Sequence, residues 1–313
     1  MSPLWAAEVL VIAALGGNAL LQRGEPLTAD NQRLNVQRAA PALAAILRAG
    51  HQLVITHGNG PQVGLLALQG AAYKPDEAYP LDVLGAETEG MIGYLIEQEL
   101  ENALGHDRPV AVLLTQIVVD ANDPAFAKPT KFVGPVYPEA EARQLAAARG
   151  WVVAPDGDKW RRVVASPKPL EIPDLAVLQL LLGQGVVVIC AGGGGIPVLR
   201  RADGSLIGVE AVIDKDHASA LLATGLKADA LLMLTDVAAV YRDFGTDHAA
   251  PIARLTPEQA AALTLPQGSM APKVAAACDF VRSGGKLAGI GRLEDAVLIL
   301  NGTAGTLVTT QTI

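Results

Sequence analysis

The chain has 313 residues, of which 50% are hydrophobic, and this is enough to bury one large core or two medium ones. Its formal net charge of −8 argues against a nucleic-acid partner, although lysines and backbone amides can still converge locally on an anion. No stretch approaches the run of about 18 apolar residues that a membrane-spanning helix needs, and residues 1–8 lack the pattern of a signal peptide. We therefore expect a cytoplasmic protein with no membrane partner. Cys190 and Cys278 each lie in apolar sequence and have no CxxC spacing, so we expect buried, reduced thiols and neither a disulfide nor a metal site.

Near the N-terminus, two predicted strands are each followed by a loop of glycine and asparagine. Residues 8–15 (EVLVIAAL) run into Gly-Gly-Asn, and residues 51–56 (HQLVIT) run into residues 57–64 (HGNGPQVG). Because open α/β sheets bind ligands at the carboxyl ends of their strands, the two loops predict one shared pocket for a small anion. Two ordinary strand-to-helix turns would give the same pattern, and His57 by itself is more typical of a structural histidine than of a catalytic base.

Two long helices and a further strand are predicted around these loops. Thr28 can cap a helix over residues 29–49, in which Pro41 predicts either a kink or two consecutive helices. Residues 82–104 predict a helix whose apolar side chains fall near one face, and this face can pack into the core or form a subunit contact. Residues 109–119 (PVAVLLTQIVV) then predict another strand.

The sequence changes in character between residues 120 and 169. Seven prolines are spread among short polar segments, which inside a compact α/β domain favours a small inserted subdomain over one long loop. Positive charge at Lys131 and in residues 159–162 (KWRR) indicates a mobile lid over an anion site. Solvated surface charge is the alternative explanation for any single one of these residues.

A stretch in the second half of the chain is typical of a phosphate site. The apolar strand 186–190 precedes four glycines, Gly192 to Gly195, whose backbone can adopt φ > 0 and approach a ligand closely. A second strand is predicted to end at residues 212–213, and residues 214–216 (DKD) stand where a helix begins. The alternative is a flexible glycine turn followed by an exposed helix cap.

The remaining sequence continues the alternation of strands and helices. Strands are predicted at 228–235, 287–290 and 305–309, and helices at 173–184, from Thr256, from 268 to about Arg282, and at 293–300. This alternation favours an α/β fold with a mostly parallel sheet and right-handed crossovers.

Eight motifs, in order over nearly the whole chain, carry a family resemblance. They are ALGGNAL (14–20), THGNGPQVG (56–64), GMIGY (90–94), DANDPAFAKPTKFVGPVY (120–137), RRVVASPKP (161–169), AGGGGIPV (191–198), VEAVIDKDHAS (209–219) and GSMAPKV (268–274). With these motifs the sequence resembles carbamate kinase, of the amino acid kinase superfamily, and it has neither a GxxxxGK[ST] P-loop nor a protein-kinase signature. Ala165 departs from the family pattern, which has proline there, and we expect this to loosen a turn without removing chemistry.

The resemblance implies a three-layer αβα fold, a homodimer, and reversible phosphoryl transfer between MgATP and carbamate that gives ADP and carbamoyl phosphate. We expect an acceptor lobe over residues 1–212, with the inserted lid at about 120–169, and a nucleotide-binding lobe over residues 213–313. Enzymes of this family usually run toward ATP, at the end of arginine, agmatine or purine breakdown.

The resemblance also implies site residues, and the charge of the reaction supports them. Transfer between two anions requires positioning and charge compensation, and an anionic acceptor needs no general base. The residues implied as catalytic are Lys131, on the acceptor side, and Lys215, Asp216 and Lys273. The amides implied to bind the acceptor are those of Gly16, Gly17, Asn18, Gly58, Asn59 and Gly60. The implied nucleotide site comprises Gly193, Gly194, Lys215, Asp236, Tyr241, Met270 and Lys273, of which Asp236, Tyr241 and Met270 equally fit core or surface. Mg²⁺ is expected to be held by the phosphates, with no direct protein ligand and with Asp216 able to order it through water.

Two other functions fit the same fold. An amino acid kinase acting on acetylglutamate, aspartate or UMP would need more polar groups for its larger acceptor, and it would lack the KPTKFVGP segment at 128–135. A non-catalytic metabolite sensor would usually have lost Lys131, Lys215 or Asp216, all of which are present.

Overall fold

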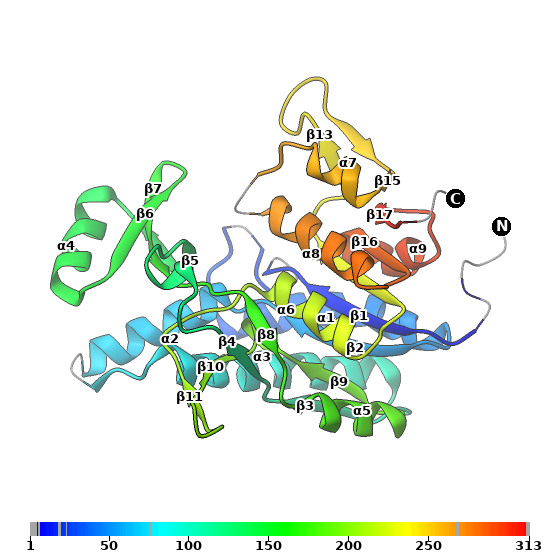
Figure 1. Cartoon of the computed structure of the whole chain (residues 1–313), viewed down its shortest axis with the longest axis horizontal. Coiled ribbons are helices and arrows are strands. Elements are labelled where there is room, and N and C mark those ends of the chain that lie inside the picture. Colours follow the sequence, from blue (N-terminus) through cyan, green and yellow to red (C-terminus); the bar gives the residue numbers. More distant parts are fainter. Residues whose placement is uncertain are drawn as a thin grey trace.

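The computed structural model of the chain describes residues 5, 7–17, 20–22, 24–74, 77–266 and 269–310. A mostly parallel sheet runs through its centre (Figure 1). Its strands are β1 (Leu10–Leu15), β2 (Gln52–His57), β3 (Val110–Leu113), β9 (Val187–Cys190), β12 (Ala230–Thr235), β15 (Arg254–Leu255), β16 (Leu287–Arg292) and β17 (Thr306–Val308). They lie in the order β15-β17-β16-β12-β1-β2-β9-β3, and every described pair is parallel except β16 with β17. The parallel arrangement confirms the predicted fold class.

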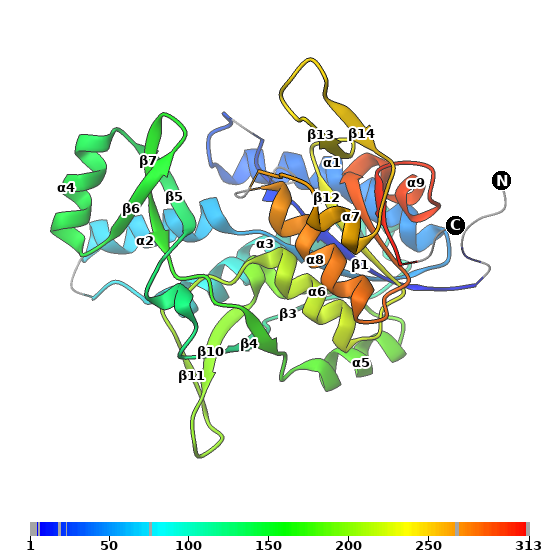
Figure 2. The ribbon, with the colours of Figure 1, turned by 45° about the horizontal axis from the view of Figure 1, so that its top comes forward.

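A small subdomain, here called the lid, protrudes from one end of the molecule (Figures 1 and 2). It comprises residues 131–164, in which β5 (Lys131–Tyr137), β7 (Lys159–Val164) and β6 (Val152–Asp156) form an antiparallel sheet beside α4 (Glu139–Arg149). The lid is anchored on α2 (Gly60–Tyr73), where a Cβ on Gly64 would lie 1.9 Å from the Cα of Gly134. Only glycines permit this approach of two backbones, so the base of the lid is fixed on the body of the protein.

Two expectations about strands are wrong. Residues 109–119 do not form one strand, because the run turns at Leu114 and Thr115 between β3 and β4 (Gln116–Val119). The amide of Thr115 donates to the Glu89 side chain at 2.9 Å, and β4 joins a separate sheet of order β11-β10-β4-β8. The other strands of this sheet are β8 (Pro169–Glu171), β10 (Ile196–Arg200) and β11 (Leu206–Gly208). Residues 209–213 are not a strand either, since the amide of Val212 donates to the carbonyl of Ala165 in a loop.

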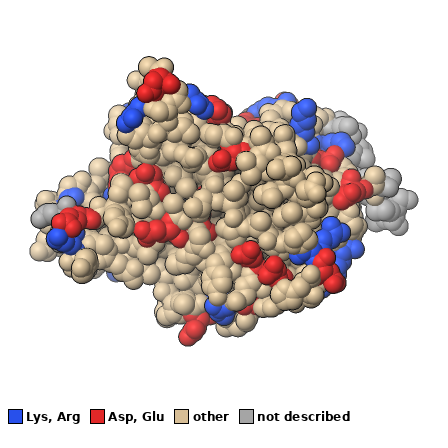
Figure 3. Space-filling model, turned by 90° about the horizontal axis from the view of Figure 1, so that it is seen from below, with Lys and Arg blue, Asp and Glu red and all other residues tan. Residues whose placement is uncertain are grey.

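One side of the molecule contains an edge strand of the central sheet. It carries β3 and α5 (Leu175–Gly183), which lie along the lower side in Figure 1. In Figure 3, which views the molecule from below, uncharged side chains cover broad areas between scattered charged ones. Leu114, directly after β3, and Val177 and Leu180 of α5 are exposed.

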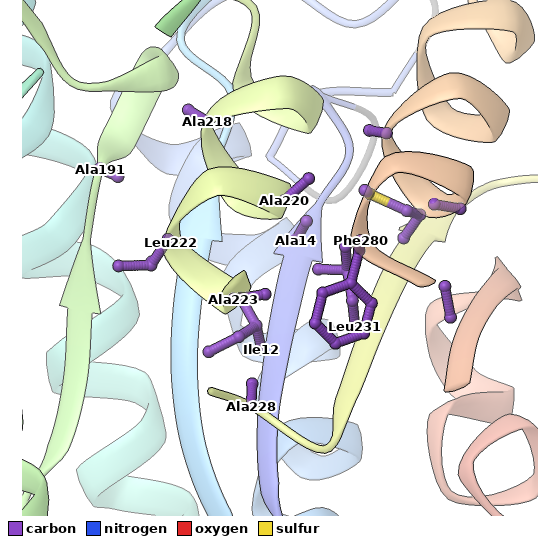
Figure 4. Packing of buried hydrophobic residues seen from close by; sticks show 14 of the residues in the cluster. Ile12, Ala14, Ala191, Ala218, Ala220, Leu222, Ala223, Ala228, Leu231 and Phe280 are labelled. Carbon is purple, nitrogen blue, oxygen red and sulfur yellow. The ribbon is translucent and has the colours of Figure 1, made fainter. Parts of the chain in front are cut away.

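Helices cover both faces of the central sheet, which confirms the three-layer αβα arrangement. On one face lie α1 (Ala29–Arg48), α3 (Leu81–Leu104) and α9 (Ala296–Leu300), whose buried side chains share one core cluster with Val11, Ala13 and Leu15 of β1. On the other face lie α5, α6 (Lys215–Gly225) and α8 (Met270–Arg282), whose buried side chains share a second core cluster with Ile12 and Ala14. Figure 4 shows α6 beside these two residues of β1. Because β1 is buried on both faces, its sequence is a continuous apolar run.

Two remaining observations concern the helices. The first is that α1 continues through Pro41 as one helix, so the division into two helices is wrong. The second is that, within the described ranges, no helix combines the length and apolar character needed to cross a membrane.

The C-terminal half also carries a hairpin of β13 (Val240–Arg242) and β14 (Ala250–Ile252). It is followed by α7 (Pro257–Ala261), which Thr256 caps as predicted.

Candidate active site

The start of α6 is the centre of a cluster of charged side chains. Asp214 is its N-cap, and its Oδ1 accepts the amides of Asp216 at 2.9 Å and His217 at 3.4 Å. These bonds satisfy amides that the first turn of a helix leaves unpaired. The other oxygen of Asp214, Oδ2, lies 2.6 Å from Nζ of Lys131 on the lid.

Asp216 holds the two other lysines of the cluster. Its Oδ1 lies 2.9 Å from Nζ of Lys215, and its Oδ2 accepts a hydrogen bond of 2.9 Å from Nζ of Lys273 on α8. Asp216 is only 3% exposed. The structure therefore brings together the four residues that the sequence implied as catalytic, from β5, α6 and α8.

The charges of the cluster are set by burial and by its mutual ion pairs. Burial raises the pKa of Asp216, but the ammonium groups of Lys215 and Lys273 outweigh it, so this pKa lies below its ordinary value. Burial is also the main cause that lowers the pKa of Lys215, to about 8, against the opposing effect of Asp216. The Lys215 contact with Asp216 is an ion pair without hydrogen-bond geometry, and among the described residues Nζ of Lys215 has no hydrogen-bond partner. Its donors can therefore serve an anion.

The glycine loops after β1 and β2 meet beside Lys215. A Cβ on Gly58 would lie 3.9 Å from the amide nitrogen of Gly17 and 4.0 Å from Cδ of Lys215. Gly16 donates its amide to the carbonyl of Leu234 at 2.7 Å, which ties this loop to β12. Gly60 begins α2, and a Cβ there would lie 3.9 Å from the carbonyl oxygen of Phe132 in the lid.

Two asparagines are also predicted to bind the phosphoryl acceptor, and the structure describes one of them. Asn59 is the N-cap of α2, and its Nδ2 donates to Oγ1 of Thr88 at 2.8 Å. Asn18 lies outside the described residues.

The four consecutive glycines are buried, and protein atoms occupy the places where their side chains would be. A Cβ on Gly193 would lie 2.1 Å from Nδ2 of Asn59, and one on Gly194 would lie 2.4 Å from the carbonyl oxygen of Ile213. The turn therefore separates the Asn59 loop from the start of α6. Its glycines admit a close approach of neighbouring chain segments, and the binding of nucleotide by Gly193 and Gly194 stays a prediction.

The three candidates for the adenine pocket lie in the C-terminal half. Met270 is the first residue of α8, one turn before Lys273, and Asp236 follows β12 and accepts a hydrogen bond of 3.1 Å from Thr235. The Tyr241 ring lies 5.9 Å from that of Phe244 in the β13–β14 hairpin. Their contact with nucleotide stays a prediction.

Sequence reasoning missed several polar residues that hold the site together. It did not assign Asp214 as the partner of Lys131, although the DKD pattern at a helix start marked it as a cap. It also missed Thr88, Glu89 and Thr115, since in sequence they look like ordinary members of a helix and a strand. Among the described residues, no three His, Cys, Asp or Glu side chains are arranged to hold a metal ion.

Comparison with known proteins places the chain in a family. A family model described as the amino acid kinase family matches residues 9–290, so the chain belongs to the amino acid kinase family. The chain is 57% identical to the carbamate kinase of Rhizobium meliloti (strain 1021), over 96% of this chain and 93% of that protein. It is 52% identical to the carbamate kinase of Escherichia coli (strain K12), over 95% and 98% of the two chains.

A solved structure agrees with the sequence relatives. The carbamate kinase from Giardia lamblia bound to AMP-PNP is 41% identical and matches with a TM-score of 0.88, over 97% of this chain and 99% of that one. The chain belongs to the carbamate kinase family. The predicted resemblance is thereby confirmed, and an amino acid kinase with a larger acceptor is not favoured.

Proposed function

We propose that this protein catalyses reversible phosphoryl transfer between ATP and carbamate, giving ADP and carbamoyl phosphate. The observation that carries the proposal is the convergence of Lys131, Lys215 and Lys273 on two adjacent aspartates, with hydrogen-bond donors of Lys215 left over. Transfer of a phosphoryl group to an anionic acceptor needs such converging cations more than it needs covalent chemistry. Membership of the carbamate kinase family supports the identity of the acceptor.

Each charged residue then has a role. Lys215 and Lys273 bind the nucleotide phosphates and the transferring group, and Asp216 positions both ammonium groups. Lys131 approaches the acceptor from the lid, on the side of α2. Because carbamate is already an anion, no group has to remove a proton from it.

The acceptor site is formed by the two glycine loops. We infer that the amides of Gly16, Gly17, Asn18, Gly58, Asn59 and Gly60 bind the carbamoyl group beside Lys215. A Cβ on Gly58 would lie within 4.0 Å of both the Gly17 amide nitrogen and the Lys215 side chain, and this closeness supports the inference. Residues 1–212 would then form the acceptor lobe, with the inserted lid, and residues 213–313 would form the nucleotide lobe.

Nucleotide binding in the C-terminal lobe follows from the same cluster. Lys273 and Met270 stand one turn apart at the start of α8, and Lys273 pairs with the Asp216 carboxylate. We infer that Gly193, Gly194, Asp236 and Tyr241 complete the nucleotide site. The AMP-PNP complex of the Giardia lamblia relative supports a nucleoside triphosphate as the ligand.

Mg²⁺ would enter with the nucleotide. Both oxygens of Asp216 lie 2.9 Å from lysine ammonium groups, so direct coordination by Asp216 would compete with two ion pairs. Mg²⁺ dehydrates reluctantly and is often held by substrate phosphates with few protein ligands. The residues present thus fit an ion held by the phosphates and ordered through water by Asp216, and the ion would supply charge neutralisation between the phosphate oxygens.

We also propose a homodimer in the cytoplasm. Leu114 (50% exposed) beside the sheet edge and Val177 (45%) and Leu180 (66%) on α5 are apolar side chains that a second copy would cover. Both cysteines are free and buried, which suits a reducing compartment. Light scattering on purified protein gives the test, because a mass of one chain at micromolar concentration would contradict the dimer.

The direct test of function is to mix the purified protein with carbamoyl phosphate and MgADP and measure ATP. We expect ATP to form, and we expect no turnover when acetylglutamate, aspartate or UMP is offered with MgATP. Nucleotide binding without ATP formation would favour a metabolite sensor. Turnover only with one of the larger acceptors would favour another amino acid kinase.

A further inference from the structure

A set of buried polar residues beneath the four glycines has no part in the mechanism proposed above. Glu89 on α3 is 2% exposed, and its Oε2 accepts the amide of Thr115 at 2.9 Å. Its other oxygen, Oε1, has no hydrogen-bond partner among the described residues. Burying a carboxyl group with an unpaired oxygen costs free energy of folding, which suggests that Glu89 has a function that offsets this cost.

Thr115, which Glu89 holds, contacts both ends of the glycine turn. Its Oγ1 accepts the amide of Ala191 at 3.1 Å, directly before the glycines, and donates to the carbonyl of Leu113 at 2.9 Å. Its carbonyl oxygen accepts the amide of Ile196 at 2.8 Å, directly after the glycines. One side chain and one carbonyl group of Thr115 therefore fix where the turn begins and where it ends.

The turn needs such support because its backbone is strained. Ala191 has φ of +50°, a conformation that residues with a Cβ rarely adopt. The turn also packs without free space against Asn59 on one side and against Ile213, which precedes Asp214, on the other. A shift of the turn would therefore move the acceptor loop and the lysine-bearing start of α6 relative to each other.

We propose that Glu89 is a positioning residue for phosphoryl transfer, which acts through Thr115 on the glycine turn and so sets the separation between the acceptor loop and α6. The proposal rests on the proposed function. Misplacement of reacting groups by about 1 Å can cost about 100-fold in rate, so a residue that touches no substrate can still control turnover.

The surroundings of Glu89 favour its neutral form. Burial raises the pKa of Glu89 well above its ordinary value, and Asp174 raises it further. His57, which like Glu89 lies against the Cβ position of Gly192, is itself neutral at physiological pH because burial lowers its pKa to about 4. The buried Cys190 thiol is neutral as well, since burial raises its pKa. A protonated carboxyl group has the shape and the acceptor oxygen of a glutamine amide, so glutamine should replace Glu89.

The test compares Glu89→Gln and Glu89→Ala with Glu99→Ala, which removes another buried glutamate of the same helix. For each variant we would measure kcat and KM for carbamoyl phosphate and MgADP, the free energy of unfolding in urea, and the exchange of the Thr115 and Ala191 amides by NMR. We expect Glu89→Ala to lower kcat about 10- to 100-fold while Glu89→Gln stays within about 3-fold of the wild type. Glu99→Ala should lose stability but keep kcat.

The two readouts separate the proposal from the proposed function. If the wild type forms no ATP, the function fails, and amide exchange still shows whether Glu89 holds the turn: Thr115 and Ala191 should lose protection in Glu89→Ala and keep it in Glu89→Gln. A folded Glu89→Ala with unchanged kcat and unchanged protection would overturn the proposal. Equal impairment of Glu89→Gln and Glu89→Ala would overturn the role of the neutral carboxyl group.

Discussion

Lys131 on the lid places its Nζ 2.6 Å from Oδ2 of Asp214, the residue that caps α6. This ion pair joins the lid to the helix that carries Lys215 and Asp216. Its side chains are 28% and 21% exposed, so solvent partly screens the attraction and limits what the pair contributes to stability. The same pair keeps the Lys131 ammonium within the lysine cluster, and activity and stability should therefore respond differently to its removal.

Replacing Lys131 with alanine should lower kcat for ATP formation by about 100-fold or more, since a preorganised donor to the transferring group is lost. The free energy of unfolding should change by less than about 1 kcal/mol, as for other partly exposed ion pairs. Steady-state kinetics and urea unfolding measure the two quantities. Lys159→Ala, an exposed lysine on the same lid, should leave both near their wild-type values, and equal rates for the two variants would argue against the role of Lys131.

Replacing Asp216 with asparagine should destabilise the protein as well as inactivate it. Lys215 and Lys273 would be left together without their shared carboxylate, and breaking a buried ion pair in this way costs about 3 kcal/mol or more. Glu171→Gln, which breaks an exposed pair with Arg200, is the matched control and should cost less than about 1 kcal/mol. Urea unfolding at neutral pH gives the free energy of unfolding of both variants. An Asp216 variant as stable as the Glu171 control would contradict the ion pairs of Asp216 with Lys215 and Lys273.

Activity should fall as the pH rises through about 8, because the pKa of Lys215 is lowered to about 8 by burial. The cation that binds phosphate is present below this pH and is lost above it, so kcat/KM for MgADP should decline between pH 8 and 10. Bound phosphate favours the charged form, and the decline in kcat should therefore lie at a higher pH than the decline in kcat/KM. A value of kcat/KM that stays constant up to the upper end of this range would show that Lys215 keeps its ordinary pKa.

The lowered pKa of Lys215 should make the protein more stable as the pH rises, although activity falls. The folded-state pKa of Lys215 lies below the ordinary value of 10.5, so the folded protein releases this proton more readily than the unfolded chain. The contribution of Lys215 to stability therefore increases as the pH rises from about 8 to about 10.5. Comparing urea unfolding of the wild type and of Lys215→Met across this range tests the sign, and a contribution that decreases would contradict it.

Replacing Gly193 with alanine should disturb the site and the fold together. A Cβ there would lie 2.1 Å from Nδ2 of Asn59, and φ is +66°. Gly204→Ala is the control, because φ is +86° at that position but no atom lies within 4 Å of the added Cβ. The control should cost about 1–2 kcal/mol from backbone strain alone. Gly193→Ala should cost about 1–3 kcal/mol more by overpacking and should raise KM for carbamoyl phosphate. Equal free energies of unfolding for the two variants would show that the Asn59 side chain can move away from the added Cβ without loss of stability.

Much of the fold could be predicted because local signals agreed with it. The apolar run of β1 has the length of a strand buried on both faces, and Thr28 and Thr256 cap their helices where the sequence indicates. The signals failed where tertiary contacts decide the outcome. The break at Thr115 depends on Glu89, 26 residues away, and no local pattern reveals that a strand changes sheet there.

For the site, the sequence by itself determined which groups are available: three lysines, two aspartates and three glycine loops, within the motifs that resemble carbamate kinase. Only the tertiary structure decided which of them meet. Lys131 and Lys273 stand far from Lys215 in the chain, and their approach to Asp214 and Asp216 depends on the lid, α6 and α8 packing together. The raised pKa of Glu89 and the lowered pKa of Lys215 also belong to the structure, because burial is a property of the packed fold and not of a residue in sequence.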